Sequence, residues 1–327
     1  MIAKRTALVT GATGFIGRRL CERLKQDGWR VIAVARQEAA GPWDEMIVHE
    51  LGSGPLTLRE RPSAVFHLAG RAHALAERPG ERESYFRVNV TGTQELLCAL
   101  GDDFGVRIVY TSSVKACGEA TGPEGVNEEV ACTPTTPYGE SKLAAEKVLL
   151  SSPFGQQAIV LRLAMVFGEG QKGNLGEMIK AVSRGRFPPV AENGNRRSLV
   201  HVDDVIESLL AAMTAPVAAA GRVYFITGLR AWSSREMYVE ICRGLGRPVP
   251  SWVVPIWILR LAGLVGDLIG TVRGRRFLWD SDKLAKLFGS ACYLPTRAIR
   301  DLGFNPRKDL GAAMPEMVRE ALAEQSI

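Results

Sequence analysis

The stretch that decides the fold is Thr10-Gly11-Ala12-Thr13-Gly14-Phe15-Ile16-Gly17, which precedes a segment of helical periodicity, Arg18–Gln26. Gly11 permits a tight turn, Gly14 lets backbone approach a ligand, and Gly17 lets a helix pack closely on the preceding strand. The N–H groups and the dipole at the start of such a helix attract phosphate. The strand–turn–helix context therefore predicts a dinucleotide-binding turn, with a loop needed only for packing as the alternative. The predicted cofactor contacts in this turn are Gly11, Thr13, Gly14, Phe15, Ile16 and Gly17.

Short apolar runs alternate with helical segments over about the first 165 residues. The runs are Ala7–Thr10, Arg30–Ala35, Met46–Leu51, Ala64–Ala69, Val106–Ser112 and Ala158–Leu163. Their hydrophobicity is nearly continuous, which indicates strands buried on both faces. Helical segments between them, at about 85–100 and 137–150, predict parallel βαβ units. We therefore expect an α/β fold built on a Rossmann-type, doubly wound parallel sheet.

The rhythm changes after Leu163, and one returning strand is expected at Arg222–Thr227. Helices are expected at Val205–Met213, Ser233–Leu245, Ile256–Leu268, Ser281–Phe288, Arg297–Leu302 and Leu310–Glu324. This pattern predicts a smaller, mostly helical C-terminal lobe over the carboxyl edge of the sheet, where ligands of such sheets bind. We expect a dinucleotide-binding domain at 1–165 and a substrate-binding lobe at 166–327, with the chain crossing back to the sheet near 197–227.

Composition limits the class of partner. The net charge of +6 over 327 residues is mild, its arginines are scattered, and aromatic residues make up only 7%, so we do not expect nucleic-acid binding. A solvated basic surface and an anionic small-molecule substrate are the two interpretations left open. Six cysteines lie far apart without a Cys-x-x-Cys pair, and four histidines lack ligand spacing. These patterns predict reduced thiols, with neither a disulfide framework nor a metal site.

One segment, Val253–Gly270, is apolar and about long enough to span a membrane. Arg260 and Asp267 within it would be costly at the centre of a bilayer. We expect a buried or groove-lining helix, and contact of residues 253–276 with a membrane surface is the alternative. Because a strand begins at once and no signal peptide precedes it, we expect a cytoplasmic protein.

The end of the second predicted strand, Val34-Ala35-Arg36, bears on the choice of cofactor. Strands at this place usually end in a carboxylate that binds the ribose hydroxyls of NAD. Here no carboxylate is present, and Arg36 stands where the 2′-phosphate of NADP would lie. We therefore predict NADP rather than NAD, with a solvated arginine and NAD as the alternative.

Tyr138 and Lys142 lie four residues apart after Pro137, a favourable first residue of a helix, so they share one helix face. A tyrosine with a pKa of about 10 is a poor base at neutral pH. A lysine ammonium and an oxidised nicotinamide ring both favour the phenolate. Ser113 falls at the carboxyl end of the fifth predicted strand and could hold a substrate oxygen. We predict that Ser113, Tyr138 and Lys142 are catalytic and move a proton and a hydride at a carbon–oxygen bond.

From about Thr6 to Leu310 the sequence resembles the extended short-chain dehydrogenase/reductases, the NAD-dependent epimerase/dehydratase family. The shared motifs are TGATGFIG at 10–17, HLAG at 67–70, NVTGT at 89–93, TSS at 111–113, YGESK at 138–142, LRLAMVFGEG at 161–170 and RRSLVHVDDV at 196–205. The resemblance implies a Ser–Tyr–Lys trio and a homodimer formed through the helices around Tyr85–Leu100 and Pro137–Leu150. It also implies a lobe that holds a nucleotide-sugar. The further cofactor contacts that it implies are Leu68, Ala69, Gly70, Asn89, Thr111, Tyr138 and Lys142.

Within that family, dehydratases carry an Asp-Glu pair where this chain has Val114 and Lys115, so we do not expect elimination of water. The motifs look most like bacterial enzymes that act at C4 of UDP-sugars, namely the 4-epimerases and 4-ketoreductases of surface-polysaccharide synthesis. This resemblance implies substrate contacts at Ser113, Asn174 and Arg197. Helix N-capping is the alternative role for Asn174.

For Arg197, the alternative is an ion pair with Asp203 or Asp204. Met165 replaces an asparagine that sugar epimerases often have, and an arginine-containing substrate motif is not evident around Leu284–Cys292. A reductase or dehydrogenase of an apolar, sterol-like ketone or alcohol is therefore the alternative function. A catalytically silent NADP sensor is a further one, against which the Ser–Tyr–Lys set argues.

Overall fold

A seven-stranded parallel sheet forms the centre of the protein in the computed structural model, which describes residues 5–71, 81–102, 104–171, 173–261, 263–264, 284 and 287–324. The strand order is β3-β2-β1-β4-β5-β6-β9. The strands are β1 Thr6–Thr10, β2 Arg30–Ala35, β3 Glu45–Val48, β4 Ala64–His67, β5 Arg107–Ser113, β6 Ala158–Leu163 and β9 Arg222–Ile226. This order reverses direction next to β1, which is the topological switch point where such sheets bind ligands. The predicted fold class is confirmed.

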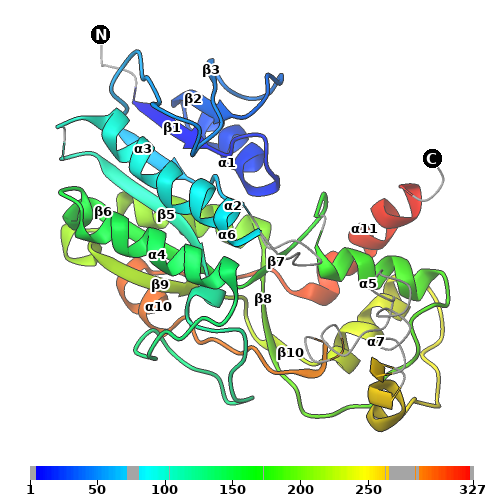
Figure 1. Cartoon of the computed structure of the whole chain (residues 1–327). Helices are drawn as coiled ribbons and strands as arrows, with labels where there is room; N and C mark the ends of the chain where they lie inside the picture. The colour runs from blue at the N-terminus through cyan, green and yellow to red at the C-terminus, as the bar shows by residue number, and fades with distance from the viewer. Residues whose placement is uncertain are drawn as a thin grey trace.

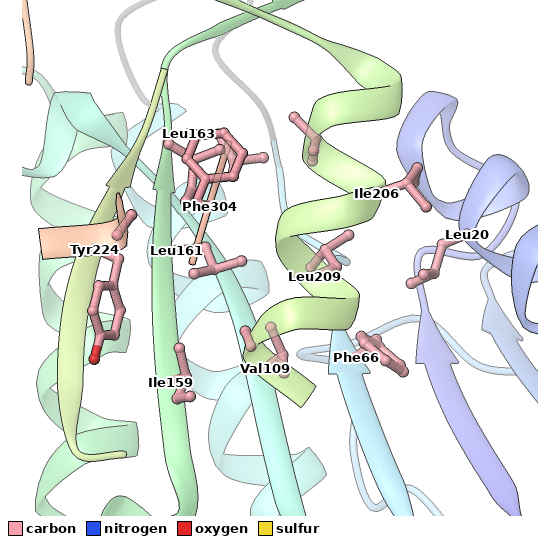
Figure 2. Packing of buried hydrophobic residues seen from close by; sticks show 14 of the residues in the cluster. Leu20, Phe66, Val109, Ile159, Leu161, Leu163, Ile206, Leu209, Tyr224 and Phe304 are labelled. Carbon is pink, nitrogen blue, oxygen red and sulfur yellow. The ribbon is translucent and has the colours of Figure 1, made fainter. Parts of the chain in front are cut away.

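Helices cover both faces of this sheet (Figure 1). Helices α1 (Phe15–Gln26) and α6 (Val202–Thr214) pack on one face, and α3 (Gly92–Leu100) and α4 (Pro137–Ser151) on the other. Figure 2 shows Leu209 of α6 over Val109 and Leu161 of the sheet. The neighbouring residues of those strands belong to the opposite core, so each strand is apolar at nearly every position.

The predicted helix at about 85–100 is composite. It begins earlier, as α2 (Glu81–Phe86), continues through a π-helical turn, η1 (Arg87–Thr91), and ends as α3. The remaining short helical turns are η2 (Val114–Ala116), η3 (Gly155–Gln157) and η4 (Val217–Ala219).

The C-terminal lobe is mostly helical but contains its own small sheet. Helices α5 (Asn174–Ser183), α7 (Ser234–Gly244) and α11 (Leu310–Ala323) share a separate hydrophobic core, and they lie together at one end of the molecule in Figure 1. The sheet has the order β10-β8-β7, with β7 at Met165–Phe167, β8 at Arg197–His201 and β10 at Ala231–Trp232. The sequence predicted neither this sheet nor α5. Helix α10 (Thr296–Leu302) instead packs beside β9 of the large sheet.

The apolar segment after residue 252 differs from its prediction. Of the predicted helices at 256–268 and 281–288, large parts lie outside the described residues. In the described part, Leu259 is buried, but Trp257, Leu261 and Leu264 are exposed, so the segment is not buried on this side. A groove-lining helix and contact with a membrane surface stay predictions. Within the described ranges, no helix is long and apolar enough to cross a membrane.

The turn between β1 and α1 is held by backbone contacts that exclude side chains. Gly11 has a φ of +70°, and a Cβ there would lie 2.8 Å from the backbone nitrogen of Ala69. A Cβ on Gly17 would lie 2.2 Å from the carbonyl oxygen of Gly11 and 2.9 Å from Cα of Ala12. Because those neighbours are backbone atoms, they cannot move aside as the end of a flexible side chain could. The glycines therefore set the distance between the helix and the turn.

We expect Gly17→Ala to lower the free energy of unfolding by about 1–3 kcal/mol, because the methyl group would push α1 away from the turn. The matched control is Gly176→Ala in α5, where the nearest atom to a new Cβ is 3.5 Å away. That change should raise stability by about 0.5–1 kcal/mol, since alanine favours a helix interior. Urea unfolding of the two variants measures both effects, and equal stability changes would contradict this account of Gly17.

Candidate active site

The N-terminus of α1 lies at the glycine turn and has no side-chain cap. Gly14 is the N-cap residue, no side chain caps it, and its own N–H donates to the Gly11 carbonyl at 2.9 Å. Thr13 and Gly14 are exposed, while Phe15 and Ile16 begin the helix half-buried. The first N–H groups of a helix have no partner within it, and their partial charge favours an anion. The residues of this turn therefore fit the pyrophosphate of a dinucleotide.

Arg36 lies directly after β2, beside this turn. The Gly11 N–H donates to the Val34 carbonyl at 2.9 Å, which ties the end of β2 to the glycine turn. The side chain of Arg36 is exposed, and this arginine stands at the end of β2, where a carboxylate would bind the ribose hydroxyls of NAD. The preference for NADP stays a prediction.

The end of β4 joins the turn to the catalytic region. The N–H of Ala69 donates to Oγ1 of Thr10 at 3.1 Å, which keeps Leu68, Ala69 and Gly70 next to the turn. A Cβ on Gly70 would lie 3.0 Å from Oδ1 of Asn89 and 3.5 Å from Nζ of Lys142. The structure thus brings Gly70, Asn89 and Lys142 together.

Asn89 lies in the π-helical turn η1, a feature that often occurs at functional sites. Its side chain is buried; Oδ1 accepts from the Arg71 N–H at 2.8 Å, and Nδ2 donates to Oγ of Ser141 at 2.9 Å. Oγ of Ser141 in turn donates to the Tyr138 carbonyl at 2.8 Å. Asn89, predicted as a cofactor contact, therefore has a positioning role as well, since it links the segment after β4 to α4.

Lys142 is buried between α4 and the end of β5. Its Nζ donates to the Thr111 carbonyl at 2.7 Å and lies 4.4 Å from the ring centre of Tyr110. Burial lowers the pKa of Lys142 to about 7, and the carboxylate of Glu146 opposes that shift. Oγ1 of Thr111 donates to the His67 carbonyl at 3.3 Å, which fixes the strand that receives the lysine.

Tyr138 enters the site from the first turn of α4, where Pro137 begins the helix and Oγ1 of Thr136 caps it. Burial raises the pKa of Tyr138, and the nearby hydroxyl of Ser113, at the end of β5, opposes this rise. The ring of Tyr85 lies 5.9 Å from that of Tyr138, tilted by 60°. Ser113, Tyr138 and Lys142, predicted separately from the sequence, are therefore placed at one edge of the sheet.

His67, a buried residue to which the sequence assigned no role, links the carboxyl ends of β1 and β4 to α3. Nδ1 of His67 lies 2.7 Å from Oγ1 of Thr10, and Nε2 lies 3.0 Å from Oγ1 of Thr93. Burial lowers the pKa of His67 to about 3, with Lys142 acting in the same direction, so the ring is neutral. Metal-ligand spacing along the chain cannot reveal a histidine that bridges the end of a strand to a helix.

Asn174 and Arg197 lie in the second lobe. Asn174 is exposed and is the first residue of α5, whose N-cap is Gly173, so the N-cap alternative is wrong. Arg197 begins β8, and its Nη1 donates to the Gly289 carbonyl at 2.9 Å. Burial lowers the pKa of Arg197. Binding of uridine diphosphate by these two residues stays a prediction.

The acidic residues offered as alternative partners of Arg197 have other contacts. Asp203 pairs with Lys308 at 3.7 Å, and its N–H donates to Nδ1 of His201 at 3.1 Å. The carboxylate of Asp204 accepts from the N–H groups of Arg307 and Lys308, at 3.0 and 3.1 Å. The suggested ion pair with Arg197 is not found among these described residues.

A parallel sheet with a glycine turn and with serine, tyrosine and lysine at its carboxyl edge is typical of enzymes that bind a dinucleotide cofactor. Within the described part of the chain, no group of three or more His, Cys, Asp and Glu residues could hold a metal ion. Residues 7–227 match the model of the NAD dependent epimerase/dehydratase family. The chain belongs to this family, and its enzymes include both epimerases and reductases.

Three relatives illustrate the range of the family. UDP-glucose 4-epimerase of Vibrio cholerae is 30% identical over 288 residues, which cover 82% of this chain and 87% of the relative. N-acetyl-alpha-D-glucosaminyl-diphospho-ditrans,octacis-undecaprenol 4-epimerase of Escherichia coli O157:H7 is 25% identical, over 91% of this chain and 89% of the relative. Among solved structures, MoeE5 in complex with UDP-glucose and NAD has a TM-score of 0.73 and 26% identity, over 98% of this chain and 99% of that one.

The buried ammonium of Lys142 predicts a pH effect on stability. In the unfolded chain its pKa returns to about 10.5, so between pH 7 and 10.5 the unfolded state binds more protons than the folded state. Stability therefore rises with pH in this window and is reduced below pH 7. Relative to Lys142→Met, which cannot titrate, the cofactor-free protein should gain about 2 kcal/mol from pH 7 to pH 9.

Urea unfolding of both proteins at matched pH values measures this difference, because effects of all other groups cancel. A difference that does not change between pH 7 and 9 would show that Lys142 keeps an ordinary pKa in the folded protein.

Proposed function

We propose that this protein is an NAD(P)-dependent 4-epimerase of a UDP-linked sugar. The observation that carries the proposal is the buried ammonium of Lys142, which meets the end of β5 beside Ser113 and lies one helical turn from Tyr138, at the sheet edge that also carries the glycine turn. The Vibrio cholerae relative and the UDP-glucose complex of MoeE5 support the choice of substrate class. A 4-ketoreductase needs the same residues, and only the absence or presence of net cofactor consumption separates the two reactions.

In this proposal the side chains of the trio divide the work. The Ser113 hydroxyl aligns the oxygen on C4 of the sugar, and Tyr138 takes the proton from that oxygen and later returns it. The ammonium of Lys142 favours the phenolate of Tyr138, because opposite charges attract. The raised pKa that burial gives Tyr138 is opposed by the Ser113 hydroxyl. When bound, the nicotinamide supplies a site that accepts a hydride and gives it back.

The turn after Ser113 favours a reaction without loss of water. Val114 and Lys115 occupy η2, and Nζ of Lys115 lies 5.9 Å from the ring centre of Tyr138. Elimination from a sugar needs a carboxylic acid and a carboxylate near the reacting carbons. An apolar residue and an ammonium at these positions supply neither.

The second lobe provides the proposed nucleotide site. The loop after β7 reaches α1, where Arg19 donates to the Glu169 carbonyl at 2.7 Å, so the lobe adjoins the glycine turn. A guanidinium such as that of Arg197 can meet diphosphate oxygens with paired hydrogen bonds. Asn174, at the start of α5, offers an amide for the same substrate. A lipid-linked sugar diphosphate would present the same group, and the substrate panel below separates the two.

We expect Tyr138→Phe to lower turnover by about 10²–10⁴-fold, because the variant cannot exchange a proton with the substrate oxygen. Cofactor affinity should stay within about threefold, since the ring and its packing remain. The matched control is Tyr238→Phe in α7, which should keep full activity. Chromatography of UDP-glucose, UDP-N-acetylglucosamine and their C4 epimers, with polyprenyl-diphosphate-linked N-acetylglucosamine as a separate substrate, measures turnover.

Turnover that survives Tyr138→Phe would reject the mechanism. Consumption of 4-keto sugars with stoichiometric oxidation of NADPH would identify a ketoreductase instead of an epimerase. Reaction only with apolar ketones, and none with any sugar diphosphate, would reject the substrate class.

We also expect Arg36→Ala to weaken NADPH binding by about 10- to 100-fold while leaving NADH binding unchanged, because a hydrogen bond to a charged group contributes about 1.5–3 kcal/mol. Arg61→Ala, another exposed arginine, is the control. Fluorescence titration of both reduced cofactors gives the ratio of their dissociation constants. A strong preference for NADH that Arg36→Ala does not alter would show that the cofactor is NAD.

A further inference from the structure

Two cysteines from separate segments meet at one arginine beside the catalytic residues. Nη1 of Arg162 donates to Sγ of Cys117 at 2.7 Å and to Sγ of Cys132 at 3.0 Å. Both sulfurs therefore lie within hydrogen-bond distance of the same nitrogen. Cys117 follows η2, four residues after Ser113, and Cys132 lies in the loop six residues before Tyr138. The pair therefore connects the two segments that carry the candidate catalytic hydroxyls.

A buried carboxylate fixes the guanidinium in this orientation. Nε of Arg162 donates to both oxygens of Glu146, at 2.9 and 3.2 Å, and Nη2 donates to Oε2 at 2.6 Å. Arg162 is 5% exposed and Glu146 is 2% exposed, and the hydroxyl of Ser112 also donates to Glu146. Since the carboxylate engages the Nε and Nη2 side of the guanidinium, Nη1 remains directed at the two sulfurs.

The surroundings make Cys132 the more reactive thiol of the two. The neighbouring Cys117 thiol and the Arg162 guanidinium lower the pKa of Cys132, against the opposing effects of burial and Glu146. The phenol of Tyr293 also faces the pair and donates to the Gly118 carbonyl at 2.7 Å. A thiolate, not a thiol, attacks oxidants, and Cys132 is only half-buried. By contrast, burial raises the pKa of Cys21 to about 12.

We propose that Cys117 and Cys132 form a redox-modification site, in which a peroxide converts the thiol pair into a disulfide that restrains the active site. The thiolate of Cys132 attacks one oxygen of hydrogen peroxide, the O–O bond breaks, and hydroxide leaves and takes up a proton. The sulfur of Cys117, losing its proton to solvent, then attacks the sulfenic acid. The S–S bond forms as the S–O bond breaks, and a second water leaves. The two thiols lose two electrons in total, which reduce one peroxide to two waters.

The position of the pair links its oxidation to the site described above. The N–H of Thr133 donates to the Cys117 carbonyl at 3.0 Å, so the loop before α4 already rests on the segment after Ser113. A disulfide would draw the two sulfurs to about 2.05 Å and remove both acceptors of Nη1 of Arg162. We expect this movement to displace Ser113 relative to Tyr138, because the two cysteines lie four residues after Ser113 and six residues before Tyr138. This consequence for turnover rests on the proposed function, whereas the chemistry of the thiols does not.

The first test measures the disulfide itself. The full-length protein is treated with increasing hydrogen peroxide, trapped with N-ethylmaleimide and analysed by peptide mass spectrometry. We expect a peptide pair joined through Cys117 and Cys132, two hydrogens lighter than the reduced peptides, which dithiothreitol reverses. Cys132→Ser and Cys117→Ser should each abolish it. Cys98→Ser, which removes an exposed cysteine far from this pair in sequence, should leave it unchanged.

A second measurement needs no variant. The rate at which iodoacetamide alkylates Cys132 in the native protein should rise with a midpoint well below that of an ordinary thiol, which titrates at about pH 8.5, because the thiolate forms at lower pH. Peroxide that oxidises Cys98 while Cys117 and Cys132 stay alkylatable would overturn the proposal, as would an ordinary midpoint at Cys132.

The last test connects oxidation to activity. Turnover of the preferred sugar nucleotide should fall several-fold in the cross-linked protein, return after reduction, and resist peroxide in Cys132→Ser. Unchanged turnover in the fully cross-linked protein would overturn the coupling to the active site. If no sugar nucleotide reacts even in the reduced protein, the proposed function fails, but the mass spectrometry still decides the fate of the thiols.

Discussion

The site depends on the burial of one ammonium group. Lys142 lies between α4 and the end of β5, where its Nζ meets the Thr111 carbonyl at 2.7 Å. A buried cation requires acceptors at fixed positions, because an unpaired one is costly. The contact with Thr111 therefore fixes the position of α4 along β5, next to Ser113. Tyr138, one helical turn before Lys142, is placed on the same side of α4. Gly70 and Asn89 lie next to the ammonium group of Lys142 at this edge of the sheet.

The sequence predicted most strands of the large sheet and the grouping of Ser113, Tyr138 and Lys142 at its carboxyl edge, because both depend on local patterns. Continuous apolar runs predicted the strands, and the spacing of Tyr138 and Lys142 predicted one helix face. Position in the chain also placed Ser113 at the end of a strand, as observed in β5. These inferences require only that parallel strands end at one edge, which the βαβ rule supplies.

The features that were not predicted depend on contacts between distant segments. Strand β10 has only two residues and is defined by pairing with β8, so it leaves no periodic signal. His67 is a bridge between Thr10 and Thr93, and nothing in its own neighbours along the chain reveals that. The segment after residue 252 has a clear hydrophobic signal, which predicted that it is buried or lines a groove. Its described side is exposed at Trp257 and Leu261, because hydrophobicity alone does not show which surface, if any, covers a segment.

The π-helical turn η1 has a consequence for how this region of the chain can vary. A turn of π-helix holds about one residue more than a turn of α-helix, so the extra residue is taken up within the wider turn. We therefore expect that deletion of one residue between Arg87 and Thr91 would restore an α-helical turn with little rotation of α2 relative to α3. The cost of such a deletion would fall on Asn89, whose side chain contacts Arg71 and Ser141 from within this turn. Chain length here is therefore tied to the placement of one buried amide.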